Sequence, residues 1–165
     1  MVLLSEKSFF RYDIIWCIHS LYTIPRSKVK ATLTNLRNLL SSNGQCFIYL
    51  PCKASAYMQF YDLYLSEIAK DDSLDSYLTA EEIVAALDSI GATSQVTSCK
   101  FDHVIGYDDV KTMETYLNQN SLRPDPQLLP QWKENSAMKN FIEECSLEAG
   151  WTFRQDVWLI SFGRN

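Results

Sequence analysis

"RYDIIWCIHSLYTIPRSKVKATLTNLRNLLSSNGQCFIYLP", residues 11–51, is the stretch of sequence that decides the fold. Residues 12–18 form an almost unbroken apolar and β-branched run, which is typical of a strand buried on both faces in a parallel sheet. From Pro25 onward the apolar residues recur at helical spacing, and "SSNG" is predicted to end this helix with Gly44 as a left-handed cap. Residues 45–51 are a second short buried strand. A strand, a helix and a strand joined by short loops predict a right-handed parallel crossover.

The rest of the chain continues as alternating helices and strands. Thr79 and Glu82 have the spacing of a capping box, which predicts a helix that begins there and ends before Gly91. Residues 94–104 and 151–163 are predicted strands. Further helices are expected over residues 55–68, 108–120 and 136–149, and a proline-rich irregular stretch over 121–132. This order predicts one α/β domain over residues 1–165, in which the last two strands form an antiparallel pair on an otherwise parallel sheet.

Composition excludes several classes of function. The 15 basic and 20 acidic residues give a net charge of -5, which disfavours a nucleic acid as partner. No apolar run approaches the roughly 20 residues of a membrane span, and the start of the chain lacks a secretory signal, so we expect no membrane and a cytoplasmic protein. The five cysteines contain no C-x-x-C pair, which favours buried reduced thiols over disulfides or a metal site. Two histidines are too few for a histidine-rich metal centre.

Four segments resemble the class I methyltransferases that use S-adenosylmethionine, among them the small-molecule N-methyltransferases of the histamine type. "YDIIWCIHSLYTIP" is similar to the fourth strand of that family and the loop after it, and "LRNLLSSNGQCFIYLP" to the next helix and the fifth strand. "LTAEEIVAALDSIGATSQV" is similar to the helix before the sixth strand, and "WTFRQDVWLISFG" to the seventh strand. The resemblance implies half of a Rossmann-like sheet, strands four to seven flanked by helices, and methyl transfer to a small molecule, with N-methylation favoured.

The resemblance does not extend to the segment that holds most of the cofactor in that family. That segment contains a glycine-rich loop after the first strand and an acidic residue that ends the second, whereas the five glycines of this chain are isolated. With strands one to three missing, residues 13–18 are expected to form a bare apolar edge, which aggregates or recruits another strand. We therefore expect a partner chain that supplies the missing half and most of the S-adenosylmethionine site, as in a split two-chain enzyme.

The candidate site residues follow the first predicted strand and the start of the last. His19 lies just beyond the carboxyl end of a strand, where open α/β sheets bind ligands. Its imidazole is able to accept a proton from an amine or to orient it, and the alternative is a hydrogen bond to backbone in a tight loop. The resemblance implies that Ile18 and Cys17 contact the cofactor and that His19, Tyr22 and Gln155 contact the substrate, with His19 as the catalytic residue.

Each of these roles has a structural alternative. Tyr22 is equally consistent with packing of its loop, Gln155 with an exposed amide at a strand end, and Cys17 with a small buried apolar group. The helical aromatic residues of 55–68 favour a core over an aromatic cage for a cation.

Two interpretations of the whole chain also stay open beside the enzyme subunit. The chain is either a non-catalytic, methyltransferase-like regulatory or binding subunit that uses the same edge, or a homodimer that pairs this edge with itself.

Overall fold

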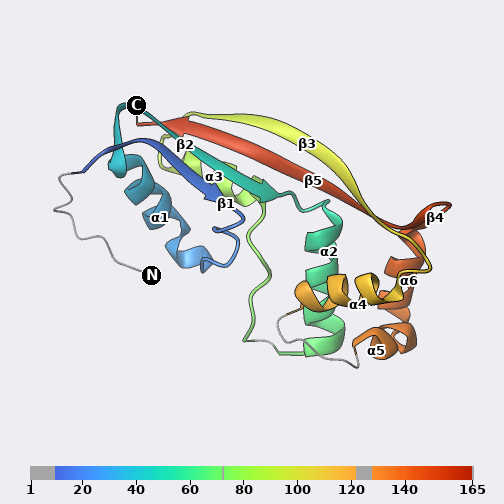
Figure 1. Ribbon diagram of the computed structural model, residues 1–165. Coiled ribbons are helices and arrows are strands. Elements are labelled where there is room, and N and C mark those ends of the chain that lie inside the picture. Colours follow the sequence, from blue (N-terminus) through green and yellow to red (C-terminus); the bar gives the residue numbers. More distant parts are fainter. Residues whose placement is uncertain (1–9, 72, 122–127, 165) are drawn as a thin grey trace. The chain divides into compact units, whose positions relative to one another are not determined.

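The computed structural model describes residues 10–71, 73–121 and 128–164 (Figure 1). The chain divides into two compact units. Unit 1 comprises residues 1–50, 78–99 and 157–165, and unit 2 comprises residues 51–77 and 100–156. Both units are therefore assembled from segments that are far apart in the sequence.

The described chain contains both helices and strands, with two runs of consecutive helices. They are β1 (Tyr12–Ile18), α1 (Arg26–Leu39), β2 (Leu40–Pro51), α2 (Ala56–Leu63), the π-helical turn η1 (Tyr64–Ala69), α3 (Ala80–Ser89), β3 (Ser94–Ile105), α4 (Val110–Gln119), α5 (Leu128–Glu134), α6 (Ser136–Glu144), β4 (Ser146–Leu147) and β5 (Gly150–Gly163). The strand order is β1-β2-β5-β3, and β4 pairs with β5. β1 and β2 are parallel, whereas Figure 1 shows β3 and β5 running in opposite directions. The predicted α/β sheet with a parallel crossover and a terminal antiparallel pair is confirmed.

In unit 1, helices α1 and α3 are joined by packing and by one charged contact. Val29 and Leu33 of α1 are buried, as are Ile83 and Leu87 of α3. The predicted capping box is confirmed, because the Thr79 hydroxyl accepts from the backbone N–H of the third helical residue and that residue's carboxylate accepts from Thr79.

The glutamate of this capping box, Glu82, also receives two hydrogen bonds from Arg26, at 2.8 and 3.2 Å. Burial acts to raise the pKa of Glu82, but the hydrogen bonds from Arg26 and Thr79 outweigh it and leave the pKa lowered. The carboxylate therefore stays charged and ties the first turn of α3 to the first turn of α1.

The end of α1 differs from the sequence prediction. β2 begins at Leu40, directly after the helix, and Gly44 lies inside that strand without a left-handed conformation. Tyr12 of β1 pairs with Leu40, and the register then shifts before Ile14 pairs with Gln45. A side chain at Gly44 would lie 2.6 Å from the Tyr12 carbonyl oxygen, so a glycine is needed here for close approach of two strands and not as a helix cap.

Unit 2 has an aromatic core. Phe60, Trp132 and Phe153 are fully buried, and the Phe60 and Trp132 ring centroids are 4.1 Å apart. The aromatic residues of α2 and η1 belong to this core, because Tyr61 is 2% exposed and its ring stacks on Tyr77 at 3.6 Å. The core interpretation of the helical aromatic residues is confirmed.

Two element boundaries in unit 2 correct the sequence prediction. Residues 128–134 form α5, because Pro130 lies in its first turn, where no backbone N–H is needed; residues 122–127 lie outside the described ranges of the chain. The predicted helix over 136–149 ends at Glu144, because Ser146 and Leu147 turn into β4 and pair with the start of β5.

The remaining expectations concern membranes, metals and thiols. Among the described residues, none of the helices has the length and apolar character needed to cross a bilayer. Within the same ranges, no group of three or more His, Cys, Asp or Glu side chains is arranged to hold a metal ion. Cys17, Cys46 and Cys52 are buried as predicted, whereas Cys99 is exposed on β3.

Candidate functional site

His19 is positioned by the way in which β1 ends. Its backbone N–H donates to the carbonyl oxygen of Tyr49 at 3.1 Å, which continues the ladder between β1 and β2 by one residue. Its own φ is then +45°, in the left-handed region that histidine visits more readily than most residues. The chain therefore turns sharply at His19, which carries its imidazole at the carboxyl end of two parallel strands.

Two tyrosine rings contact the His19 ring. The Tyr49 ring meets it edge-on with centroids 5.2 Å apart, and the Tyr22 ring does so at 6.4 Å. The predicted pair His19 and Tyr22 is thus brought together. Tyr49 is a site residue that the sequence patterns above do not identify, although a signal exists: it lies near the end of the second strand, and parallel neighbouring strands end at the same edge.

The environment of His19 favours the neutral imidazole, although the side chain is exposed in part. Partial burial against the two rings lowers the pKa of His19 from its ordinary value of 6.5. Burial raises the pKa of Tyr49, and the charge of Cys99 adds to this effect, so the phenol stays protonated. A neutral imidazole beside the protonated Tyr49 phenol is able to accept a proton, which is what a general base requires.

The two residues before His19 point to opposite faces of the strand. The Ile18 side chain is 57% exposed, whereas Cys17 is 7% exposed and its thiol hydrogen bonds with that of Cys46. Of these two, only Ile18 therefore presents a side chain to solvent at the end of β1. The interpretation of Cys17 as a small buried group is confirmed, and the cofactor contact of both residues stays a prediction.

Gln155 lies in unit 2 and differs from its predicted setting. β5 begins five residues earlier, at Gly150, so Gln155 is inside the strand and not at its start. It is 7% exposed, and the prediction of an exposed amide is wrong. Its carbonyl oxygen accepts from the Ser55 hydroxyl at 2.5 Å, and its amide donates to the Tyr116 hydroxyl at 3.3 Å. These protein partners satisfy both ends of the amide.

The hydrogen bond from the Ser55 hydroxyl to Gln155 is expected to stabilise the folded protein. Ser55→Ala is expected to lower the free energy of unfolding by about 1–2 kcal/mol, because the buried Gln155 oxygen loses its donor. The measurement is chemical denaturation. Ser66→Ala is the matched control, since the exposed Ser66 hydroxyl only donates to a carbonyl of its own helical turn, and it is expected to change stability by less than about 0.5 kcal/mol. Equal effects of the two changes would contradict a special role for Ser55.

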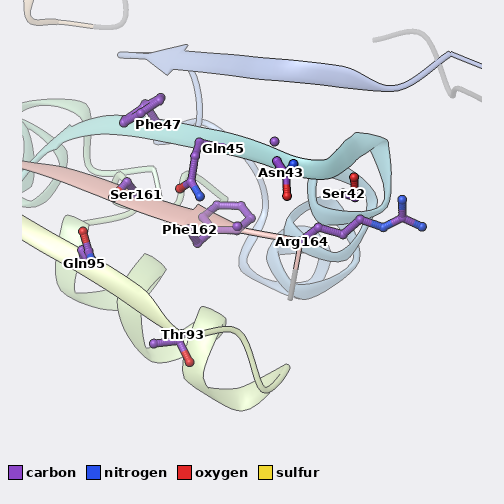
Figure 2. A pocket seen from close by; sticks show the side chains of 11 residues that line it. Ser42, Asn43, Gln45, Phe47, Thr93, Gln95, Ser161, Phe162 and Arg164 are labelled. Atoms are coloured by element: carbon purple, nitrogen blue, oxygen red, sulfur yellow. The ribbon is translucent and has the colours of Figure 1, made fainter.

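A polar hollow of about 650 Å³ lies elsewhere in unit 1 (Figure 2). Its polar lining includes Ser42, Asn43, Gln45, Gln95, Ser161 and Arg164. These residues come from the first half of β2, the start of β3 and the end of β5. The hollow is therefore at the end of β2 away from Tyr49, and it is not at the carboxyl edge where open α/β sheets bind ligands.

The outer strand β1 carries a row of exposed apolar side chains. Tyr12, Ile14, Trp16 and Ile18 are between 47% and 58% exposed. β1 is the first strand in the sheet order, and no strand among residues 10–71, 73–121 and 128–164 pairs with its outer edge. The predicted bare, apolar edge is confirmed for the described residues. The prediction that residues 12–18 are buried on both faces is wrong, because only Cys17 of β1 is buried.

The fold of the chain is similar to that of solved structures, one of them described as a methyltransferase. The sequence is 29% identical over 108 residues to histamine N-methyltransferase from Cavia porcellus, a match that covers 60% of this chain and 36% of that protein. No family model matches the sequence.

Two solved structures share the fold. A Bacillus halodurans protein assigned as a methyltransferase has a TM-score of 0.59 at 12% identity, covering 93% of this chain and 64% of that chain. A cyclopropane-fatty-acyl-phospholipid synthase-like protein from Lactobacillus casei has a TM-score of 0.58 at 10% identity, covering 94% and 57%. The chain thus spans about three fifths of these structures, and its match spans about a third of the curated relative.

Proposed function

We propose that the chain takes part in methyl transfer from S-adenosylmethionine to a nitrogen of a small molecule, and that it is the substrate-side subunit of a two-chain enzyme. The observation that carries this proposal is the position of His19 at the carboxyl end of β1, with its ring edge-on to the rings of Tyr22 and Tyr49. The sequence similarity to histamine N-methyltransferase supports a nitrogen atom of a small molecule as the methyl acceptor.

The proposed chemistry asks little of the protein beyond alignment and proton removal. S-adenosylmethionine supplies a methyl group that its sulfonium already activates, so positioning contributes most of the rate. The amine must reach this methyl group as a free base, because only an unprotonated nitrogen has a lone pair with which to attack. The neutral His19 imidazole accepts the proton that the nitrogen loses, and the aromatic rings of Tyr22 and Tyr49 hold the imidazole in place.

The residues of this chain fit only one side of the cofactor. Ile18 offers an exposed side chain at the end of β1, next to the His19 backbone turn. The five glycines are isolated in the sequence, so none forms the G-x-G loop through which backbone approaches the rest of the cofactor. We therefore propose that the partner binds most of S-adenosylmethionine.

The bare edge of β1 is the proposed junction with that partner. A strand edge with apolar, exposed side chains pairs readily with another strand. The chain covers 64% and 57% of the two solved structures with this fold, so each of those proteins contains further segments outside the matched part. A glycine-rich polypeptide that adds a strand to β1 would supply both the missing sheet and the cofactor loop.

Purification from native cells tests the proposal. The chain carries an affinity tag, co-purified polypeptides are identified by mass spectrometry, and cofactor binding is measured by calorimetry. We expect one partner with a strand, a G-x-G turn and an acidic residue roughly 20 positions later. The complex, but not the isolated chain, is expected to bind S-adenosylmethionine and to methylate histamine or another small amine.

Two results would count against elements of the proposal. An isolated, monomeric chain that binds S-adenosylmethionine by itself would exclude the need for a partner. A glycine-rich segment found on the same polypeptide would replace the two-chain arrangement with a single chain and leave the methyl transfer intact.

A further inference from the structure

The strand β3 has a second open edge, at the other end of the strand order from β1 (Figure 1). β3 pairs with β5, and no other strand that the structure describes pairs with it. It is 12 residues long, contains no proline, and is exposed from Gln95 to Val104. Proteins often protect such edges with prolines or with charges that repel a second strand. The charges that β3 carries therefore decide which strand can pair with it.

β3 carries one positive and one negative side chain, two residues apart. Lys100 pairs with Asp156 of β5 at 3.3 Å, and Asp102 pairs with Arg154 of β5 at 3.4 Å. All four residues belong to unit 2. The Lys100 and Asp102 side chains are still 70% and 44% exposed. Phe101 is 48% exposed and lies on the other face, because successive residues of a strand alternate between faces. The edge therefore has balanced charges on one face and an exposed aromatic ring on the other.

We propose that β3 of one chain pairs antiparallel with β3 of a second copy of this chain, about a two-fold axis that passes through Phe101. In this register Phe101 lies opposite its own copy, and Lys100 lies opposite Asp102 of the second copy. Two-fold symmetry forms this oppositely charged pair twice. The product is a homodimer in which the two sheets join into one.

Charge selects this register over its neighbours. A two-fold axis perpendicular to the sheet preserves the two faces, so opposed residues share a face and the axis passes through a residue. An axis at Lys100 or at Asp102 would set two like charges against each other, which destabilises a strand pair. Only the axis at Phe101 sets Lys100 opposite Asp102.

The intrachain ion pairs extend the match across the interface. Across four strands the charges would alternate, from Asp156 and Lys100 of one chain to Asp102 and Arg154 of the second copy. Backbone hydrogen bonds and the contact between the two Phe101 rings would supply affinity, as in other pairings at a sheet edge. The exposed charges would contribute mainly to the choice of register, because surface ion pairs add little stability.

The inference goes beyond the proposed function and does not depend on it. β1, the proposed junction with a partner, and β3 are the two ends of the strand order. Pairing at β3 therefore leaves the edge of β1 available. If both proposals hold, the enzyme contains two copies of each chain.

Charge reversal tests the register. Sedimentation equilibrium of the full chain measures the dimer, and Lys100→Glu is expected to weaken it at least about 10-fold, because both cross-strand pairs become repulsive. Asp102→Lys is expected to do the same. An equal mixture of these two variants is expected to dimerise again, since the negative edge of one then faces the positive edge of the other. Lys139→Glu is the matched control, because it makes the same charge change and also breaks an exposed ion pair, but on α6. It is expected to change the dissociation constant less than about 2-fold.

A cysteine at the proposed axis tests the pairing directly. Phe101→Cys, in a Cys99→Ser background that removes the exposed thiol of β3, is expected to form an interchain disulfide on mild oxidation. Directly opposed Cα atoms of antiparallel strands are about 4.5–5.5 Å apart, within the reach of a disulfide. Val104→Cys in the same background is the control, because Val104 is also exposed on β3 but would lie about 20 Å from its copy. It is expected to form no disulfide.

Four results would overturn the inference. They are a chain that stays monomeric at about 1 mM, a dimer that Lys100→Glu and Lys139→Glu weaken equally, a mixture of the charge variants that stays monomeric, and a dimer that Trp16→Gln on β1 dissociates. None of these measurements involves a cofactor. If they fail while the purified complex binds S-adenosylmethionine, only this inference fails. If the β3 dimer forms but no complex with S-adenosylmethionine exists, the proposed function fails and the dimer stands.

Discussion

His19→Ala in the assembled complex is expected to lower kcat about 100-fold, which is the low end of what a positioned general base contributes. The neutral imidazole lies between Tyr22 and Tyr49, and alanine leaves no group there that can accept a proton. Affinity for S-adenosylmethionine is expected to change little, because we propose that the partner holds most of it. The measurement is methyl transfer to a small amine at saturating cofactor, together with calorimetric binding of the cofactor.

The pH dependence of the same reaction provides a second readout. Burial lowers the pKa of His19 below 6.5, so the imidazole stays neutral to a lower pH than an ordinary histidine. Activity is therefore expected to persist through pH 6.5 and to fall as the pH drops through the lowered pKa. Because the folded protein favours the neutral form, protonation of His19 also destabilises the fold over the same acidic range. His19→Ala is expected to remove both dependences.

His103 provides the control for the His19→Ala variant. His103→Ala removes the only other histidine, which lies on the exposed strand β3, and it is expected to leave the acidic limb of the pH profile in place. If His19→Ala leaves turnover unchanged while the complex still assembles, the chain is a methyltransferase-like regulatory subunit. A loss of assembly instead of turnover would assign His19 a structural role.

Gly150→Ala is expected to lower the free energy of unfolding by about 2–6 kcal/mol. Gly150 has a φ of +137°, which residues with a side chain rarely adopt and which costs about 1–3 kcal/mol. A methyl group there would also collide with the carbonyl oxygen of Ile105 and lie 3.0 Å from the Gly106 Cα, and overpacking of this kind adds about 1–3 kcal/mol. Chemical denaturation followed by circular dichroism measures the loss.

Gly106→Ala is the matched control, because Gly106 is next to the same contact but lacks a positive φ. Its added methyl group would meet the Asp108 carboxylate, whose side chain can rotate away. We expect a loss below about 1 kcal/mol. A comparable loss for the two glycines would show that backbone conformation at Gly150 is not the cause.

Local sequence patterns predict much of the fold, because many helices and strands depend on contacts between residues close in the sequence. The helical spacing of α1 reflects burial that repeats along one helix face, and the Thr79 capping box is closed within four residues. The apolar run of β1 predicts a strand but not its burial, since only Cys17 of that strand is buried. Gly44 shows the limit of such patterns. The reason for a glycine is a carbonyl oxygen of Tyr12, a residue on another strand, which no local pattern records.

The candidate site also contains some residues that the sequence predicts and others that it does not. His19 and Tyr22 were predictable because the end of a strand marks the ligand edge of an α/β sheet. The same rule contains a signal for Tyr49, which lies near the end of the parallel neighbour of β1. The buried network of Gln155 was not predictable, because it depends on a contact between residues 100 positions apart.

The sequence by itself determined the order of helices and strands, the position of His19 at a strand end and the isolation of all five glycines. These properties follow from composition and short-range periodicity. Only the tertiary structure decided that Trp16 stacks on Phe47 beside a polar hollow and that Gln155 is enclosed by Ser55 and Tyr116. Pairing register and burial are set by segments distant in the chain, and those segments meet only when the sheet forms.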